Sequence, residues 1–227
     1  MAQVTALIDA NNFYASCEQS LDPALIGRPV VVLSNNDGCI VARSAEARAL
    51  GIAMGTPYFK AKQTLERCGV VVRSSNYALY ADMSQRLMSL LESQVEELEV
   101  YSIDEAFARI SRPAAADLLP WGRQLRALVR RNLGLPIAIG LGASKGQAKL
   151  ANRLAKVEAS HAGLFDLGHC SHQDRWLETI AIEDVWGIGR KLADWCRLRG
   201  VRNARELRDM ASGPLRAKAG VVGLRLQ

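Results

Sequence analysis

The chain has 227 residues, of which 49% are hydrophobic and 23% are charged, as in an ordinary folded globular protein. No apolar stretch approaches the roughly 20 residues of a membrane-spanning helix. The short N-terminal apolar run ends at Asp9, so we expect neither a membrane span nor a secretory leader. The five cysteines include no CxxC pair, which argues against a zinc site or a disulfide framework and favours the cytoplasm. The formal net charge of +6 favours polyanionic partners such as nucleic acid.

The N-terminal part of the sequence alternates short apolar runs with short helical patterns. A turn-prone stretch at 34–38 separates two of the apolar runs and predicts a hairpin. In chain order, the expected elements are a strand at 3–9, a helix at 11–20, strands at 29–33 and 39–42, helices at 44–50 and 56–68, and a strand at 70–73. The small elements after the first helix indicate an insertion between two parts of a larger sheet.

Longer elements follow. Five apolar residues recur at helical spacing and predict a long amphipathic helix: Met83, Leu87, Leu90, Leu91 and Leu98. Then come expected strands at 98–101 and 106–110, a helix at 120–133 with a solvated arginine face, a strand at 136–141, a helix from Ser144 to about Val157, and a helical, basic segment after Asp166. This order predicts an α+β fold in which helices cover one face of a sheet.

Two adjacent carboxylates, Asp104 and Glu105, lie between the two short strands. Like charges held 4 Å apart repel by about 4 kcal/mol at an effective dielectric of 20. Neighbouring residues of a regular strand point to opposite faces, so the strand has to end or bulge here if both are to share a site. Together with Asp9 they would form an oxygen-rich cluster suited to Mg²⁺. The alternatives are an exposed hairpin tip for the pair and a helix cap for Asp9.

The helix after Ser144 carries a row of cations. Lys145, Lys149 and Lys156 share one broad face, with Arg153 between them. A triphosphate bound beside an acidic metal cluster would need such cations. The alternative is a solvated lysine face, as on many surface helices.

The stretch at 183–191 has the pattern of a helix-hairpin-helix, with Gly187-Ile188-Gly189 as the hairpin. Its glycines allow backbone N–H groups to approach a phosphate at the N-terminus of the next helix. Such contacts hold a nucleic-acid backbone without reading its sequence. Arg190 and Lys191 favour DNA over the alternative, a tight turn between helices.

Together these motifs closely resemble the Y-family translesion DNA polymerases, and most closely the UmuC type of the bacterial SOS response. The resemblance extends over nearly the whole chain. The matching strings are DANNFYASCE from Asp9, PVVVLSNNDGC from Pro29, AEARALG from Ala45, SSNY from Ser74, YADMS from Tyr80, YSIDEAF from Tyr101 and VWGIGR from Val185.

The resemblance implies the right-hand polymerase fold. The palm, a ferredoxin-like antiparallel sheet with helices on one face, would comprise residues 1–12 and 79–170. Small α/β fingers would occupy 13–78, and an incomplete helix-hairpin-helix thumb 171–227. The little finger, which follows the thumb in this family, is expected to be absent from these 227 residues. The implied activity is error-prone, template-directed transfer of a nucleotide from dNTP to a primer 3′-hydroxyl during translesion synthesis in the bacterial cytoplasm.

The resemblance also implies roles for individual residues. The catalytic carboxylates would be Asp9, Asp104 and Glu105, which with the Ala10 carbonyl would hold two Mg²⁺ ions, replaceable by Mn²⁺. The nucleotide-binding residues would be Asn12, Phe13, Tyr14, Arg48 and Lys156, with the Tyr14 ring as a steric gate against a ribose 2′-hydroxyl. The residues over the nascent base pair would be Ile40, Val41 and Ala42. The DNA-binding residues of the hairpin would be Gly187, Ile188, Gly189, Arg190 and Lys191.

The implied partners are damaged primer–template DNA, dNTP, UmuD′, RecA and a sliding clamp, without a membrane. One departure concerns Ala45, which stands where many family members have a phosphate-binding tyrosine, so the grip on the triphosphate is expected to be weaker. A missing little finger would also remove phosphate contacts and so weaken DNA binding.

Two other functions remain open. The chain could be a non-catalytic SOS factor that binds damaged DNA or partner subunits, which salt-sensitive DNA binding without extension would indicate. A nucleotidyl cyclase is more remote, because the Tyr14 gate and the Gly-Ile-Gly hairpin have no purpose in that reaction.

Overall fold

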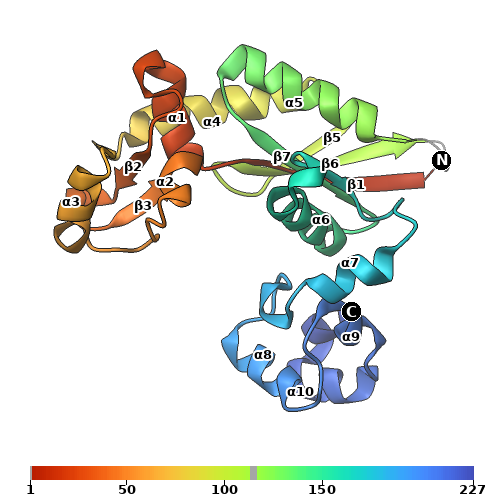
Figure 1. The fold of residues 1–227 in the computed structure, drawn as a ribbon. Helices are drawn as coiled ribbons and strands as arrows, with labels where there is room; N and C mark the ends of the chain where they lie inside the picture. Colours follow the sequence, from red (N-terminus) through yellow and green to blue (C-terminus); the bar gives the residue numbers. More distant parts are fainter. Residues whose placement is uncertain (1, 113–116) are drawn as a thin grey trace. The chain divides into compact units, whose positions relative to one another are not determined.

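A computed structural model describes residues 2–112 and 117–227 of the chain (Figure 1). Its described strands form a larger and a smaller sheet. The larger sheet has five strands, in the spatial order β5 (Glu97–Val100), β6 (Glu105–Arg112), β1 (Ala2–Ala10), β7 (Ile137–Gly142) and β8 (Leu164–Asp166). The expected α+β class is confirmed. The apolar run of the sequence's first strand extends as β1 to Ala10, so Asp9 lies inside the strand.

The larger sheet is mixed, whereas a purely antiparallel one was expected. β7 and β8 pair in parallel, with Ile139 opposite Leu164. The helix α6 (Lys145–Val157) joins them, and such a crossover connection is what brings two consecutive strands into parallel alignment. β8 is not predictable from the sequence pattern, because three residues are too few to show a periodicity. All six residues of β7 are buried, which explains its unbroken apolar sequence.

The smaller sheet has the order β3 (Ile40–Arg43), β2 (Val30–Leu33) and β4 (Val71–Ser74). β2 and β3 form the expected antiparallel hairpin, and β4 pairs with β2 in parallel. The short helices α2 (Ala45–Ala49) and α3 (Tyr58–Arg67) accompany this sheet (Figure 1). Ser44 begins α2, since its side chain accepts a hydrogen bond from Ala47 N. A small apolar core forms here, and it includes Val31, Leu33, Ile40, Ala47 and Leu65.

Three further helices contribute buried residues: α1 (Phe13–Leu21), α4 (Tyr77–Glu92) and α5 (Leu119–Leu133). The expected helical face of α4 is confirmed at Met83, Leu87 and Leu91, which are buried. Leu98 was wrongly included, because α4 ends at Glu92 and Leu98 lies in β5. The expected solvated arginine face of α5 is also wrong at Arg126. Its Nε donates to the Ile137 carbonyl at 2.9 Å, and burial lowers the pKa of this guanidinium.

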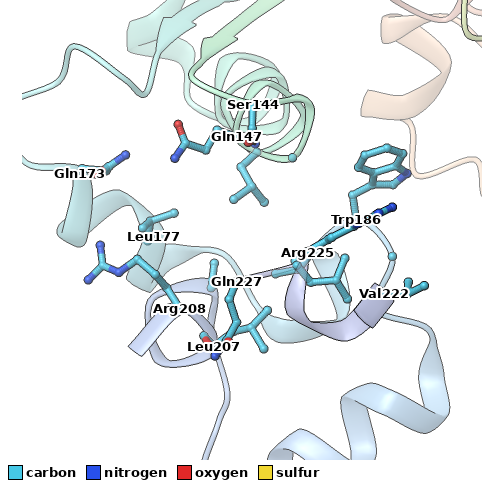
Figure 2. A pocket seen from close by; sticks show the side chains of 16 residues that line it. Ser144, Gln147, Gln173, Leu177, Trp186, Leu207, Arg208, Val222, Arg225 and Gln227 are labelled. Atoms are coloured by element: carbon cyan, nitrogen blue, oxygen red, sulfur yellow. Dashed lines mark hydrogen bonds between the residues drawn. The ribbon is translucent and has the colours of Figure 1, made fainter. Parts of the chain in front are cut away.

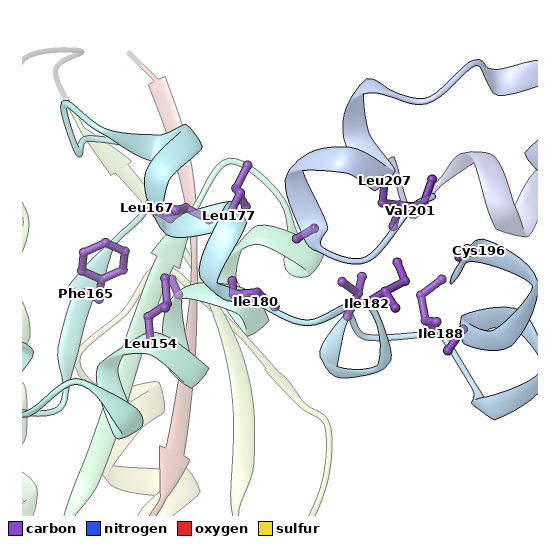
Figure 3. Packing of buried hydrophobic residues seen from close by; sticks show 14 of the residues in the cluster. Leu154, Phe165, Leu167, Leu177, Ile180, Ile182, Ile188, Cys196, Val201 and Leu207 are labelled. Atoms are coloured by element: carbon purple, nitrogen blue, oxygen red, sulfur yellow. The ribbon is translucent and has the colours of Figure 1, made fainter. Parts of the chain in front are cut away.

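The C-terminal part is helical, as expected, with α7 (Gln173–Thr179), α8 (Arg190–Arg197), α9 (Ala204–Asp209) and α10 (Ser212–Leu224). A continuous apolar core holds these helices together with α6 and β8 (Figure 3). Its members include Leu154, Phe165, Leu177, Ile180, Ile182, Ile188, Cys196, Val201 and Leu207. Ile188 is therefore a core residue as well as the centre of the Gly-Ile-Gly hairpin.

The chain divides into two compact units, described separately below. One comprises Met1–Leu7, Arg109–Leu119 and Ile139–Gln227, and the other comprises Ile8–Ala108 and Pro120–Ala138. The division into palm, fingers and thumb at the expected boundaries stays a prediction. Within 2–112 and 117–227, no helix has both the length and the apolar character needed to span a membrane.

Candidate functional site

The end of β1 and the acidic turn before β6 lie next to each other. The backbone N–H of Ala10 donates to the Asp104 carbonyl at 2.9 Å. Asp9 is buried, with 7% of its surface exposed, and Asp104 and Glu105 are half-buried. One backbone hydrogen bond thus joins the two segments that carry the three predicted carboxylates.

The acidic turn itself is organised by Ser102. Its Oγ donates to Asp104 Oδ1 at 2.7 Å and accepts a hydrogen bond from Glu105 N at 3.1 Å. The N–H groups of Tyr101 and Ser102 both donate to the Glu105 carbonyl, which tightens the turn. β6 begins at Glu105, so Asp104 lies outside the strand. The alternation of a regular strand therefore does not force the two carboxylates onto opposite faces.

Ser102 was assigned no role from the sequence. Its position two residues before an aspartate is the local signal that could have found it, because short polar side chains often bond to the backbone one to three residues away.

The donor chemistry of this region fits a hard divalent cation. Asp9, Asp104 and Glu105 offer carboxylate oxygens, and Ala10 offers a backbone carbonyl, the ligand types that Mg²⁺ prefers. Within the described ranges, however, no three His, Cys, Asp or Glu side chains are already grouped as a set of metal ligands. Cation binding would therefore have to draw these carboxylates together.

A second cluster lies where α1 begins. Asn12 adopts a left-handed conformation, with φ 52° and ψ 40°, immediately before the helix. Its Oδ1 accepts a hydrogen bond of 2.6 Å from the guanidinium of Arg48, an exposed residue in the last turn of α2. Phe13, the first residue of α1, is buried. The first N–H groups of a helix have no partner within it, so a partial positive charge accompanies the Arg48 guanidinium here.

Tyr14 belongs to a group of three aromatic rings. It stacks on Tyr80, with ring centroids 4.3 Å apart and planes inclined by 14°. Tyr77 meets the edges of both rings, each at 6.2 Å. Burial raises the pKa of the Tyr14 hydroxyl, and the negative charge of Asp104 contributes to the same rise. Asp104 therefore lies within electrostatic reach of the Tyr14 ring.

The remaining residues predicted to bind the nucleotide or to cover the nascent base pair differ in burial and in location. Ile40 is fully buried in the core of the smaller sheet, whereas Val41, its neighbour on β3, is half-buried on the opposite face. Ala42 is buried on the same face as Ile40. Lys156 is exposed in the last turn of α6, within the other compact unit, and its role at a triphosphate stays a prediction.

The predicted hairpin joins two helical segments, as expected. A 3₁₀ turn at Ile182–Asp184 precedes it. The helix α8 follows, and Gly189 is its N-cap residue. Gly187 has φ +92°, a conformation that favours glycine. The side chains of Arg190 and Lys191 are exposed at the N-terminus of α8.

An aromatic contact supports this hairpin. The Lys149 Nζ lies 5.3 Å from the centre of the Trp186 ring, and 39% of Trp186 is exposed. Such an arrangement is a cation–π interaction. The contact was missed from the sequence, because the two residues lie 37 positions apart and no periodicity relates them.

The hairpin also borders a cavity of about 360 Å³ in the same compact unit (Figure 2). Its walls come from α6, α7, the hairpin, α9 and the C-terminal residues, among them Ser144, Gln147, Leu177, Trp186, Leu207, Arg208, Arg225 and Gln227. Leu226 occupies the space beside Gly187, where a Cβ atom would come within 2.7 Å of its side chain. The C-terminal residue Leu226 thus lies against Gly187 of the hairpin.

Comparison with known proteins places the sequence in one family. Residues 8–153 match the model of the impB/mucB/samB family. UmuC of Salmonella typhimurium is 48% identical over 219 residues, which cover 96% of this chain and 52% of UmuC. DNA polymerase IV of Corynebacterium diphtheriae is 33% identical over 208 residues, covering 90% of this chain and 45% of that protein. The chain thus spans about half the length of these relatives.

The fold has solved counterparts. The crystal structure of DinB from Sulfolobus solfataricus superposes with a TM-score of 0.80 and 24% identity, covering 98% of this chain and 65% of DinB. Likeness at this level of identity shows the fold. The family model covers both the acidic turn and α1, and the chain belongs to the impB/mucB/samB family.

Proposed function

We propose that the chain is the catalytic core of an error-prone translesion DNA polymerase, which transfers nucleotides from dNTP to a primer 3′-hydroxyl on damaged templates. The observation that carries the proposal is the hydrogen bond of Ala10 N to the Asp104 carbonyl. It holds β1 and the acidic turn together, with Tyr14 stacked on Tyr80 close by. Family membership with UmuC and DNA polymerase IV supports the assignment.

In this proposal the carboxylates of Asp9, Asp104 and Glu105, with the Ala10 carbonyl, would hold two Mg²⁺ ions. When bound, these ions would lower the pKa of the primer hydroxyl and neutralise charge on the leaving pyrophosphate. Ser102 would orient the Asp104 carboxylate through its 2.7 Å hydrogen bond.

The residues at the start of α1 would bind the nucleotide. Backbone N–H groups of Asn12 and Phe13 would meet the triphosphate, and Arg48, now bonded to Asn12 Oδ1, would turn to it. The Tyr14 ring would exclude a 2′-hydroxyl by contact. Of the three residues proposed over the nascent base pair, Val41 is the one that β3 directs away from the core.

DNA contact would fall to the hairpin, where Gly187, Gly189, Arg190 and Lys191 would hold a phosphate backbone. Such a substrate places the proposed activity in the bacterial cytoplasm. Contacts with UmuD′, RecA and a sliding clamp stay predictions from the family resemblance.

Primer extension with dNTP and Mg²⁺ tests the proposal. Asp104→Asn keeps the size of the side chain and an oxygen for Ser102, but it removes one negative charge from the cation site. We expect extension to fall by about 100-fold or more, the scale seen when a group that stabilises transition-state charge is lost. Glu66→Gln, which neutralises an exposed carboxylate of α3, is the matched control and should extend primers like the parent.

Unchanged extension by Asp104→Asn would exclude this assignment of the carboxylates. A parent chain that binds DNA in a salt-sensitive manner, yet extends no primer at any concentration, would favour the non-catalytic alternative.

A further inference from the structure

The proposed gate residue, Tyr14, stacks on Tyr80, whose own position is fixed by a hydrogen bond. Tyr80, at the start of α4, is fully buried and lies nearly parallel to the Tyr14 ring. Its hydroxyl donates to Glu18 Oε1 at 2.8 Å. Glu18 follows Tyr14 by four residues on α1, so the gate and the anchor share one helix face.

Arg73 of β4 continues the chain of contacts. Its Nε lies 3.9 Å from Glu18 Oε2, and its terminal nitrogen pairs with Asp22 Oδ2 at 3.0 Å. Glu18 is well shielded, with 15% of its side chain exposed. The carboxylate therefore has a hydrogen-bond donor on one oxygen and a cation beside the other, which limits the positions it can take.

The Tyr80 hydroxyl is a stable hydrogen-bond donor to Glu18. Burial raises the pKa of its hydroxyl, and the neighbouring Glu18 charge adds to the rise, so the hydroxyl keeps its proton and remains a donor at neutral pH. Losing that donor would leave a largely shielded carboxylate oxygen of Glu18 without its hydrogen-bond partner, which is unfavourable. The Tyr80 ring, on which Tyr14 stacks, is consequently held in place by packing and by the hydrogen bond of its hydroxyl to Glu18.

We propose that Tyr80 and Glu18 are positioning residues for sugar discrimination. The Tyr80–Glu18 hydrogen bond, braced by Arg73, would fix the depth at which the Tyr14 ring meets the sugar of the incoming nucleotide. The inference rests on the proposed gate function of Tyr14. It adds that selectivity against a 2′-hydroxyl depends on two side chains that do not touch the nucleotide.

The test compares dCTP with CTP opposite a template guanine. Insertion is measured as kcat/KM with Mg²⁺, and equilibrium binding is measured with Ca²⁺ on the same primer–template. Tyr80→Phe keeps the ring and removes the donor, and Glu18→Ala removes the acceptor. We expect each variant to lower the dCTP:CTP ratio by about tenfold, because a displacement of about 1 Å in a positioned group can change rates by up to about 100-fold.

The change should come mainly from better use of CTP, with kcat/KM for dCTP close to that of the parent. General destabilisation would instead lower the values for both nucleotides. Glu18→Gln keeps an oxygen for the Tyr80 hydroxyl and should fall between the parent and Glu18→Ala.

Tyr77→Phe is the matched control. Tyr77 belongs to the same group of rings, but within the described part of the chain its hydroxyl makes no hydrogen bond, so this variant should keep the parental ratio. Tyr14→Ala is the reference variant and should admit ribonucleotides most freely while keeping deoxynucleotide insertion.

The outcomes separate this inference from the function on which it rests. If Tyr14→Ala relaxes the ratio but Tyr80→Phe and Glu18→Ala do not, the positioning role is overturned and the gate stands. If Tyr14→Ala leaves the ratio unchanged, the gate assignment fails and the positioning role fails with it. A parent chain that binds neither nucleotide would overturn the polymerase assignment itself.

Discussion

Cys17 lies on α1 one turn after Tyr14 and is fully buried. Burial raises the pKa of its thiol to about 12, and the charges of Glu18 and Asp104 act in the same direction. The thiol of Cys17 therefore keeps its proton at neutral pH.

We predict a loss of stability at alkaline pH that depends on this thiol. The folded pKa lies above the ordinary value of 9.0, so the unfolded chain releases its proton first as the pH rises. The contribution of Cys17 to stability is therefore complete below about pH 9 and is lost as the pH approaches 12.

Urea unfolding at about pH 7 and about pH 10.5 measures the effect. The parent should lose more unfolding free energy between the two conditions than Cys17→Ala does. Cys68→Ala changes an exposed thiol and should behave like the parent. Equal alkaline losses in the parent and in Cys17→Ala would contradict the prediction.

Among the elements, β7 and α6 pack unusually closely. A Cβ atom on Gly140 of β7 would lie 2.1 Å from Asn152 N and 2.3 Å from the Ala148 carbonyl oxygen, both on α6. Backbone atoms cannot move aside as a flexible side chain can. Only glycine fits at this position, and Asn152 Nδ2 adds a 3.3 Å hydrogen bond to the Leu7 carbonyl of β1.

Gly140→Ala should lower the free energy of unfolding by about 3 kcal/mol or more, at the upper end of the cost of overpacking. Gly213→Ala, in α10, is the matched control, because nothing lies within 4 Å of the added methyl group. Alanine also favours a helix over glycine, so this variant should be neutral or slightly stabilising. Urea denaturation compares the two, and equal stability would refute the close-packing argument.

Sequence patterns predicted most elements because their causes are local. Ser144 accepts a hydrogen bond from Gln147 N at the start of α6, and the apolar spacing of α4 matches its buried face. The errors arose where local patterns coincide with another structure. Leu98 continues the helical spacing of α4 by chance, and the Arg126 side chain turns to a carbonyl that is not near it in sequence.

For the molecule as a whole, the net charge of +6 gives a general attraction to polyanions, but charge alone does not locate a binding surface. The exposed pair Arg190 and Lys191 at the start of α8 is the local feature that we propose contacts a phosphate backbone.

DNA binding by the full 227-residue chain should weaken linearly in a plot of log affinity against log salt concentration. Arg190→Gln and Lys191→Gln should each reduce the slope by about 1 and weaken all DNA sequences alike, as the loss of one phosphate contact does. Fluorescence anisotropy of a labelled primer–template over a salt series provides the measurement.

Lys62→Gln removes one exposed positive charge from α3, which is not part of the hairpin, and serves as the control. It should leave the slope close to that of the parent. Hairpin variants with the parental slope would show that the hairpin does not contact phosphate.

The sequence by itself determined the fold class, the family and the candidate residues, because caps, periodicity and contiguous motifs such as Asp104-Glu105 and Gly187-Ile188-Gly189 are local properties of a chain. Only the tertiary structure decided which distant side chains meet. Tyr80 lies under Tyr14 and is bonded to Glu18, and Lys149 lies over Trp186. Such contacts depend on how helices and strands pack, and packing depends on shape and burial summed over the whole core, which no short stretch of sequence contains.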